Sequence, residues 1–140
     1  GAAPVICYES IWGNYVAEYV KMGAQFIAVI TNDGWWGDTP GYKQHMSFSR
    51  LRAIESRRSV VRSANTGISC VINQRGDVIH QTKWWKKDAF NAVVNKNNEL
   101  TFYATYGDVM GRSFSFVSVL LLLLTFVRFF KKRYMNTTKN

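Results

Sequence analysis

The sequence predicts an α/β fold followed by one membrane-spanning helix, and three observations support this prediction. Two apolar, β-prone runs at residues 4–9 and 26–31 flank a helical stretch, and this order is typical of a parallel strand pair in an α/β sheet. Further short β-prone runs follow one another between residues 59 and 82. Near the end of the chain, residues 113–127 are apolar and carry no charged group.

The first helix is predicted over residues 10–22. Ser10 is a residue type that caps helix N-termini, and Gly23 can end the helix because glycine accepts the left-handed conformation of a C-terminal cap. Apolar residues share one face and polar residues the other: Ile11, Tyr15, Tyr19 and Met22 against Asn14, Glu18 and Lys21. This spacing is typical of an amphipathic helix.

The second helix is predicted over residues 42–58, after a glycine-rich loop at residues 32–41. Its apolar side chains recur at three-residue spacing, at Phe48, Leu51 and Ile54. Three charged residues share this spacing and are expected to form an ion-pair ladder along the helix: Arg52, Glu55 and Arg58.

The rest of the domain is predicted to be mainly strands. Three short strands are expected at residues 59–64, 67–72 and 77–82, with a hairpin turn between the last two. A further strand is predicted at residues 89–95. The aromatic segment 101–108 then joins the domain, residues 1–111, to the apolar helix.

The composition favours a globular domain and argues against a nucleic-acid partner. Of the 140 residues, 47% are apolar and 15% aromatic, which excludes disorder for most of the chain. The formal net charge is +9, but five of the 18 cationic residues lie at residues 128–140, where no carboxylate occurs. The remainder is only mildly basic, so the charge does not form the footprint of a nucleic-acid binder.

The start of the chain indicates a piece of a larger protein. Gly1 is not an initiator methionine, and a buried strand is predicted within a few residues of it. Terminal residues usually fray, so an interior strand at this place is unusual. We therefore expect residues 1–111 to be the C-terminal portion of a larger domain.

The apolar run near the C-terminus predicts a membrane-spanning helix over residues 112–133. Counted from Phe114 to Phe130, it is about 26 Å long, just short of the roughly 30 Å hydrocarbon core, and Arg128 can extend it by snorkelling to the headgroups. A buried soluble helix is the alternative. Since cations concentrate after the span, the basic tail at residues 134–140 is expected to be cytoplasmic, with the domain on the other side of the membrane.

The two cysteines lie in different surroundings. Cys7 falls where a strand gives way to a helix, whose positive end favours an anionic sulfur, as in many nucleophiles; an inert core cysteine is the alternative. Cys70 alternates with Ile68 and Ile72 and is expected to be a small core residue. The spacing does not require a disulfide between them.

The loop after the second strand contains two adjacent tryptophans, Trp35 and Trp36. Loops at the carboxyl ends of parallel strands often form ligand sites in α/β folds. The two side chains are therefore expected either to pack onto the domain or to form an apolar lid or membrane-facing surface. His45 could act as a base, but no carboxylate lies at a spacing that would orient it, so a hydrogen-bonded structural histidine is expected. Because metal-ligand spacings and phosphate-binding glycine motifs are absent from the sequence, no metal and no cofactor are predicted.

Four stretches of the sequence, in this order and spacing, resemble one family. They are the cysteine, aromatic residue and glutamate of "PVICYES", the loop "TNDGWWG", the helical "RAIE" and the strand "NTGIS". Together they are similar to the C-terminal part of the apolipoprotein N-acyltransferase family, a membrane-embedded branch of the carbon-nitrogen hydrolase (nitrilase) superfamily. The resemblance runs from Pro4 to the apolar helix.

The resemblance implies an αββα sandwich outside the membrane and a Glu-Lys-Cys catalytic triad. Cys7 matches the nucleophile, Glu9 matches the acidic residue kept beside it, and Tyr8 matches the aromatic residue between them. The family's base glutamate and lysine lie upstream of these residues. Glu18 and Lys21 do not match their positions, so neither role is assigned in this sequence.

The implied activity is a transfer of an acyl chain in two steps. A phospholipid donates the chain to Cys7 as a thioester, and the N-terminal diacylglyceryl-cysteine of an apolipoprotein accepts it. Trp35 and Trp36 would shield this intermediate in a lipid-facing loop. The implied location is the bacterial inner membrane, with the catalytic domain on the periplasmic side. A membrane-anchored amidase and an inactive membrane-tethered remnant remain as alternatives.

Overall fold

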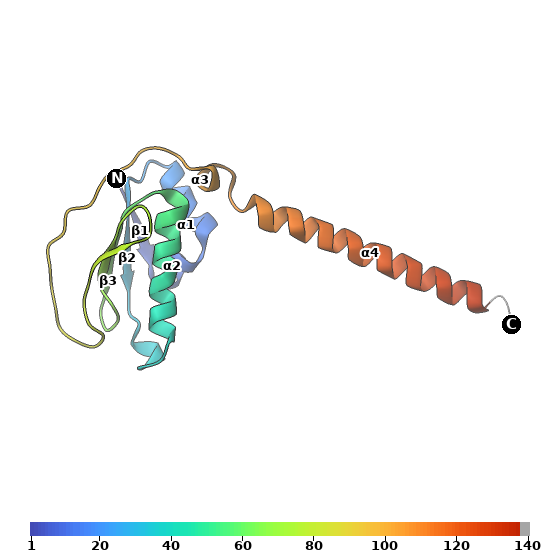
Figure 1. Cartoon of the computed structure of the whole chain (residues 1–140), viewed down its shortest axis with the longest axis horizontal. Coiled ribbons are helices and arrows are strands. Elements are labelled where there is room, and N and C mark those ends of the chain that lie inside the picture. The colour runs from blue at the N-terminus through green and yellow to red at the C-terminus, as the bar shows by residue number, and fades with distance from the viewer. Residues whose placement is uncertain (138–140) are drawn as a thin grey trace. The chain divides into compact units, whose positions relative to one another are not determined.

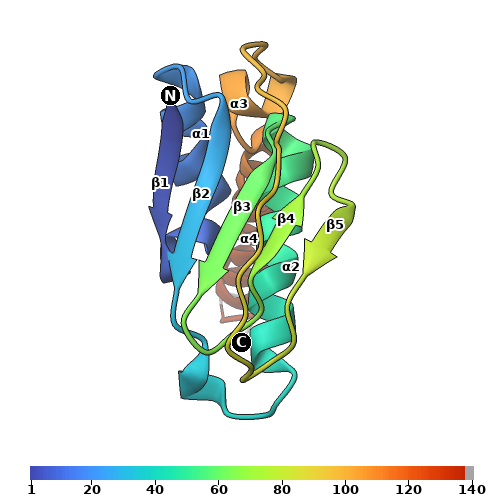
Figure 2. The same cartoon turned by 90° about the vertical axis from the view of Figure 1, so that its left-hand side faces the viewer.

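A five-stranded sheet in the order β1-β2-β3-β4-β5 organises the first unit of the chain, Gly1–Gly107 (Figures 1 and 2). The computed structural model describes residues 1–137, and the second unit, from Asp108 onward, is treated separately below. β1, β2 and β3 are parallel, and β4 and β5 continue the sheet antiparallel. The strands are β1 Ala2–Ile6, β2 Phe26–Thr31, β3 Val60–Ala64, β4 Cys70–Ile72 and β5 Val78–Gln81.

Successive side chains of the parallel strands point alternately to the two faces of the sheet, one buried and the other largely exposed. Val5 pairs in register with Val29, and both side chains are buried on the face that the helices cover. Ile6 and Ile30, one residue further along each strand, point to the other face and are 62% and 60% exposed. The apolar core therefore lies between the sheet and one helical layer, so this unit supplies one helix layer and one sheet layer of the predicted sandwich.

The helices α1, Gly13–Lys21, and α2, Gly41–Ser56, lie behind the sheet in Figure 2, and the short α3, Phe102–Tyr106, follows the last loop. The predicted N-cap of the first helix was wrong. The chain first makes a 3₁₀ turn, η1, at Cys7–Ile11, and the Ser10 side chain bonds within that turn. α1 begins only after it.

The predicted ion-pair ladder on α2 was only partly correct. Arg52 pairs with Glu55 at 3.0 Å, but α2 ends at Ser56, and Arg57 (φ +50°) takes the left-handed conformation of a helix end. Arg58 therefore lies beyond the helix. It is buried, burial lowers the pKa of its guanidinium, and it donates hydrogen bonds to the backbone carbonyls of Ala24, Ser56 and Glu99.

The segment after β5 is not the strand that the sequence predicted at residues 89–95. It crosses the face of the sheet opposite the helices, as Figures 1 and 2 both show, without entering the strand order. Individual bonds fasten it instead: the Ser59 hydroxyl donates to the Asn95 carbonyl, and the Asn97 side chain donates to the Arg57 carbonyl. Because it passes over the sheet and not along an edge, no ladder forms.

The second unit contains the helix α4, Val109–Thr137. Residues 109–131 of it are long and apolar enough to cross a membrane, with a mean hydropathy of 2.1 over an 18-residue stretch. At about 1.5 Å per residue these 23 residues span roughly 35 Å, which exceeds the hydrocarbon core. The helix continues into the predicted tail as far as Thr137, and residues 138–140 of that tail lie outside the described residues.

Candidate active site

Cys7 stands at the turn from β1 into η1, as the sequence predicted. Its φ is +49°, in the left-handed region that costs a non-glycine residue about 1–3 kcal/mol. Its side chain is partly exposed. A strained strand-to-helix turn is also how α/β-hydrolases project a nucleophile from the end of a sheet. Such a turn has to be held in place by its neighbours.

Two side chains of the same turn hold the peptide groups around Cys7. The Glu9 Oε2 atom accepts a hydrogen bond of 2.7 Å from the Ile6 N–H, and the Ser10 hydroxyl donates one of 2.7 Å to the Cys7 carbonyl. Glu9 Oε1 also accepts from the Tyr15 hydroxyl at 3.2 Å. Hydrogen bonding to Tyr19, partial desolvation and the nearby Glu9 raise the pKa of Tyr15 to about 12, so its hydroxyl keeps its proton at neutral pH.

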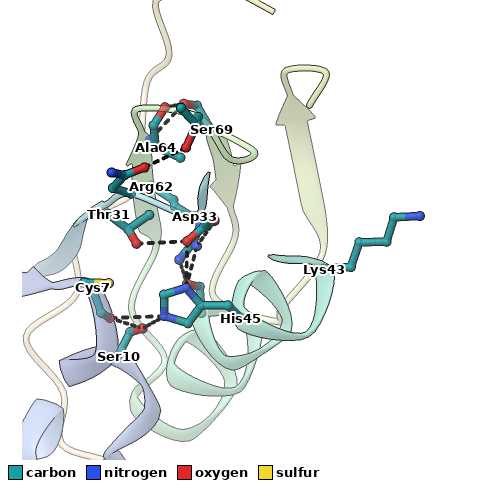
Figure 3. Close-up of polar contacts among 12 residues, drawn as sticks. Cys7, Ser10, Thr31, Asp33, Lys43, His45, Arg62, Ala64 and Ser69 are labelled. Carbon is teal, nitrogen blue, oxygen red and sulfur yellow. Dashed lines mark hydrogen bonds and ion pairs between the residues drawn. The ribbon is translucent and has the colours of Figure 1, made fainter. Parts of the chain in front are cut away.

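A buried polar network lies directly behind the turn (Figure 3). His45, on α2, places Nε2 3.2 Å from the Cys7 carbonyl oxygen and Nδ1 2.9 Å from Asp33 Oδ1. Asp33 follows β2, and its other oxygen accepts a 2.7 Å hydrogen bond from Arg62, on β3. The Thr31 hydroxyl donates to Asp33 at 3.0 Å. The network thus joins the carboxyl ends of β1 and β2 to β3 and α2.

The carboxylate that orients His45 contradicts the sequence expectation that none was available. Asp33 precedes His45 by 12 residues, and the loop 32–41 folds back to bring them together. Gly67, in the "NTGIS" stretch, leaves room for this carboxylate, because a Cβ atom at that position would collide with the Asp33 side chain.

Charge balance keeps Asp33 ionised although it is fully buried. Burial acts to raise the pKa of its carboxyl group, but the hydrogen bond from His45 and the charge and hydrogen bond of Arg62 outweigh burial. The net effect places the pKa of Asp33 below its usual value of 3.8. At neutral pH the site therefore contains a buried carboxylate–guanidinium pair.

The two tryptophans of the loop lie in different surroundings. Trp36 packs onto the domain, with its ring centroid 5.1 Å from that of His45 and 5.7 Å from that of Tyr8. Tyr8 in turn stacks on His45 at 5.5 Å. Trp35 is 84% exposed. Trp36 and Tyr8 therefore cover the His45 ring, and Trp35 projects into the surroundings.

Cys70 was correctly predicted as a core residue. It is fully buried on β4, and desolvation raises the pKa of its thiol to about 11. Both cysteines are free, so Cys7 is not tied up in a disulfide. Cys7 is thus the more accessible of the two sulfurs.

A pocket of about 490 Å³ opens beside the loop that follows β3. Its lining includes Thr66 and Gly67 from that loop and Trp85, Lys86 and Asp88 from the segment after β5. β3 lies two strand spacings from β1, which is about 10 Å. Among residues 1–137, no three His, Cys, Asp or Glu side chains gather in a way that could hold a metal ion.

Asp33, Ser10 and Arg62 were not assigned to the site from the sequence. Two features could have indicated Asp33 and Arg62. Asp33 lies in the loop at the carboxyl end of a parallel strand, and Arg62 interrupts a strand of otherwise uncharged residues. Buried charges in such places are usually paired.

Comparison with known proteins finds a matching family model and similar proteins. The family model described as Carbon-nitrogen hydrolase matches residues 2–98. Three bacterial proteins named apolipoprotein N-acyltransferase are similar. The one from Chlorobaculum tepidum is 38% identical over 126 residues, 90% of this chain and 24% of that protein. Those from Geobacter metallireducens and Pasteurella multocida are 36% and 35% identical over 75% and 85% of this chain, which is 20% and 22% of their own lengths. The chain thus spans a fifth to a quarter of these curated relatives.

Proposed function

Since the chain belongs to the carbon-nitrogen hydrolase family, we propose that it carries the nucleophile of an enzyme that transfers an acyl chain from a phospholipid to an apolipoprotein. The name shared by the similar proteins supports this choice within the family. The observation that carries the proposal is the position of Cys7, which is partly exposed on a strained turn at the carboxyl edge of the sheet.

In the first step the Cys7 thiolate attacks the carbonyl carbon of a phospholipid ester. The carbon–sulfur bond forms, the ester carbon–oxygen bond breaks, and the lysophospholipid leaves as an alcohol after taking up the proton removed from the thiol. In the second step the α-amino group of a diacylglyceryl-cysteine attacks the thioester. The carbon–nitrogen bond of an amide forms, the carbon–sulfur bond breaks, and the proton that the amine gives up returns to the base or to the thiolate. The glutamate that removes the thiol proton and the lysine that steadies the oxyanion are expected upstream of this sequence.

The other residues of the turn act around this nucleophile. Glu9 serves the reaction through its bond to the Ile6 N–H, which helps to hold the turn. Tyr8 and Trp36 form the wall of the site, and the exposed Trp35 is the lipid-facing residue of the loop. The polar pocket with Lys86 suits the phosphate of the donor, since an ammonium group attracts an anion.

We also propose that the protein resides in the bacterial inner membrane. α4 would span the bilayer, and the first unit would face the periplasm. The cations that follow the apolar run support a cytoplasmic C-terminus. The similar proteins come from bacteria, which supports the choice of membrane.

Acyl trapping tests the proposed reaction. The complete gene product, purified in detergent, is incubated with a phospholipid that carries an alkyne-tagged acyl chain, and tagged peptides are identified by mass spectrometry. We expect the tag on Cys7 as a hydroxylamine-sensitive thioester, its absence in Cys7→Ser and its persistence in Cys70→Ala. A diacylglyceryl-cysteine peptide should discharge it. Hydrolysis of a small amide without any tag on Cys7 would instead favour the membrane-anchored amidase.

A further inference from the structure

The imidazole ring of His45 is held at both nitrogens, and one of them reaches the backbone of Cys7. Nε2 lies 3.2 Å from the Cys7 carbonyl oxygen and 3.1 Å from Ser10 Oγ. Nδ1 lies 2.9 Å from Asp33 Oδ1. The ring is only 2% exposed and is covered by the stacked Tyr8. His45 thus has a single orientation, set by the turn η1 and by the loop after β2.

The partners of Nε2 require that it donates. The Ser10 hydroxyl gives its proton to the Cys7 carbonyl at 2.7 Å, so both oxygens present lone pairs to Nε2. Only an Nε2–H can bond to them. The Cys7 carbonyl therefore accepts two hydrogen bonds, one from Ser10 and one from His45.

The partners of Nδ1 fix the other edge of the ring. Arg62 Nη2 lies 3.1 Å from Nδ1 and donates to Asp33 Oδ2 at 2.7 Å. Asp33 Oδ1 lies 2.9 Å from Nδ1, so this edge of the ring is held between the two members of the buried ion pair. Arg62 holds Asp33, and Asp33 holds His45. This series of contacts ends at Cys7, the residue with the left-handed backbone conformation.

Holding this carbonyl fixes the direction in which the sulfur leaves the backbone. The bonds from Ser10 and His45 to the Cys7 C=O restrain the peptide group between Cys7 and Tyr8, and the bond from the Ile6 N–H to Glu9 restrains the end of β1 just before Cys7. The direction of the thiol is then set mainly by its own χ1 rotation. Small errors in the placement of a nucleophile slow a reaction strongly, so such restraint affects rate more than binding.

We propose that His45 is a positioning residue for Cys7, acting through the hydrogen bond from its Nε2–H to the Cys7 carbonyl, with Asp33 and Arg62 holding the ring. The inference rests on the proposed acyl transfer. His45 does not remove the thiol proton in this arrangement, because its bond to Cys7 runs to the backbone oxygen. It is fully engaged in holding the turn.

Two isosteric substitutions separate this role from the alternatives. His45→Gln places an amide N–H near the position of Nε2 and keeps the bond to Cys7, whereas His45→Asn places one near Nδ1 and keeps only the bond to Asp33. In the complete gene product we expect Cys7 acylation in His45→Gln to stay within about threefold of wild type. In His45→Asn it should fall about tenfold, the effect of one lost hydrogen bond, with the KM for phospholipid unchanged. Equal losses in both variants, or a larger loss in His45→Gln, would overturn the proposal.

Alkylation of Cys7 gives a readout that does not depend on the acyl transfer. In a Cys70→Ala background, the rate of reaction with iodoacetamide is measured on the peptide that contains Cys7. We expect Cys7 to be alkylated fastest in the wild type, more slowly in His45→Gln and most slowly in His45→Asn. If wild-type protein takes no acyl chain from phospholipid, the proposed function fails, while this order still decides the role of His45. If the order does not appear, the positioning role fails.

Ser10→Ala provides a gentler variant, should the His45 variants not fold. It removes the other hydrogen bond to the same carbonyl without creating a large cavity. We expect Cys7 acylation and alkylation to slow by about three- to tenfold, with the melting temperature of the protein little changed. Rates equal to those of the wild type would show that the carbonyl contacts do not position the sulfur.

Discussion

Asp33 is the residue on which the charge balance of the site depends. It is fully buried and bonded to Arg62 and His45, so its removal would leave the Arg62 guanidinium without its counter-charge. We expect Asp33→Asn to lower the free energy of unfolding by about 3–5 kcal/mol, the usual effect of breaking a buried pair. Urea denaturation of the gene product measures this. Asp77→Asn, on the exposed hairpin, is the matched control and should change stability little.

The same carboxylate makes stability depend on acid. Because the pKa of Asp33 is lowered on folding, its contribution is fully present above 3.8 and is lost as the pH falls through the lower, folded value. The wild-type protein should therefore lose stability below pH 4 more steeply than Asp33→Asn, which has no carboxylate to titrate. Denaturation midpoints measured between pH 2 and pH 6 test this. If the midpoints of wild type and Asp33→Asn fell in parallel with pH, the lowered pKa of Asp33 would be contradicted.

Residues that act with their neighbours in the chain were predictable, and residues that act across the fold were not. The strand-to-helix position of Cys7 and the core position of Cys70 follow from the residues on either side. The bond between His45 and Asp33 depends on how a loop folds back, which no periodicity encodes. The sequence therefore indicated the position of Cys7 without the contacts that support it.

At the scale of elements, the short turn η2, Gly34–Trp36, separates an exposed tryptophan from a packing one. Trp35→Ala should leave the free energy of unfolding within about 0.5 kcal/mol of wild type, because this side chain is 84% exposed. It should slow acylation from phospholipid vesicles. Unchanged acylation in Trp35→Ala would argue against a lipid-facing role.

Trp36→Ala should behave differently, because its ring contacts Tyr8 and His45. Two aromatic contacts are worth about 1–3 kcal/mol together, and thermal melting should show this loss. Trp36→Phe retains part of the ring contact, so its melting temperature is expected to lie between those of the wild type and Trp36→Ala. The fit is close, since a side chain at Gly41 would approach the indole ring to 2.6 Å.

Elements with a strong local sequence pattern were predicted well. Elements whose form depends on a contact elsewhere in the fold were not. Four of the five strands and the second helix occur within about three residues of the predicted ranges, whereas the predicted run 4–9 overlaps β1 only at residues 4–6 and continues into η1. The apolar run at residues 89–95 has the composition of a strand, but it lies over the sheet and away from any free edge. Ser10 has the chemistry of a helix cap, but the Cys7 carbonyl accepts its proton.

At the scale of the whole molecule, the proposed topology predicts opposite accessibilities for the two units. Single cysteines are introduced as Lys96→Cys in the first unit and Tyr134→Cys near the end of α4, in a Cys7→Ser, Cys70→Ala background. A membrane-impermeant maleimide should label Lys96→Cys in intact spheroplasts. It should label Tyr134→Cys only after lysis. The reverse pattern would place the first unit in the cytoplasm and exclude a periplasmic reaction.

The left-handed backbone of Cys7 implies a trade-off between stability and activity for the whole protein. Alanine normally stabilises a chain relative to glycine, but at φ +49° glycine is free of strain and alanine is not. We expect the free energy of unfolding of Cys7→Gly to exceed that of Cys7→Ala by about 1 kcal/mol. Its melting temperature should be correspondingly higher. Both lack the thiol. If Cys7→Gly is the more stable of the two variants, a residue without backbone strain is compatible with the fold at this position. Selection for a reactive sulfur would then explain why the protein carries a strained cysteine there.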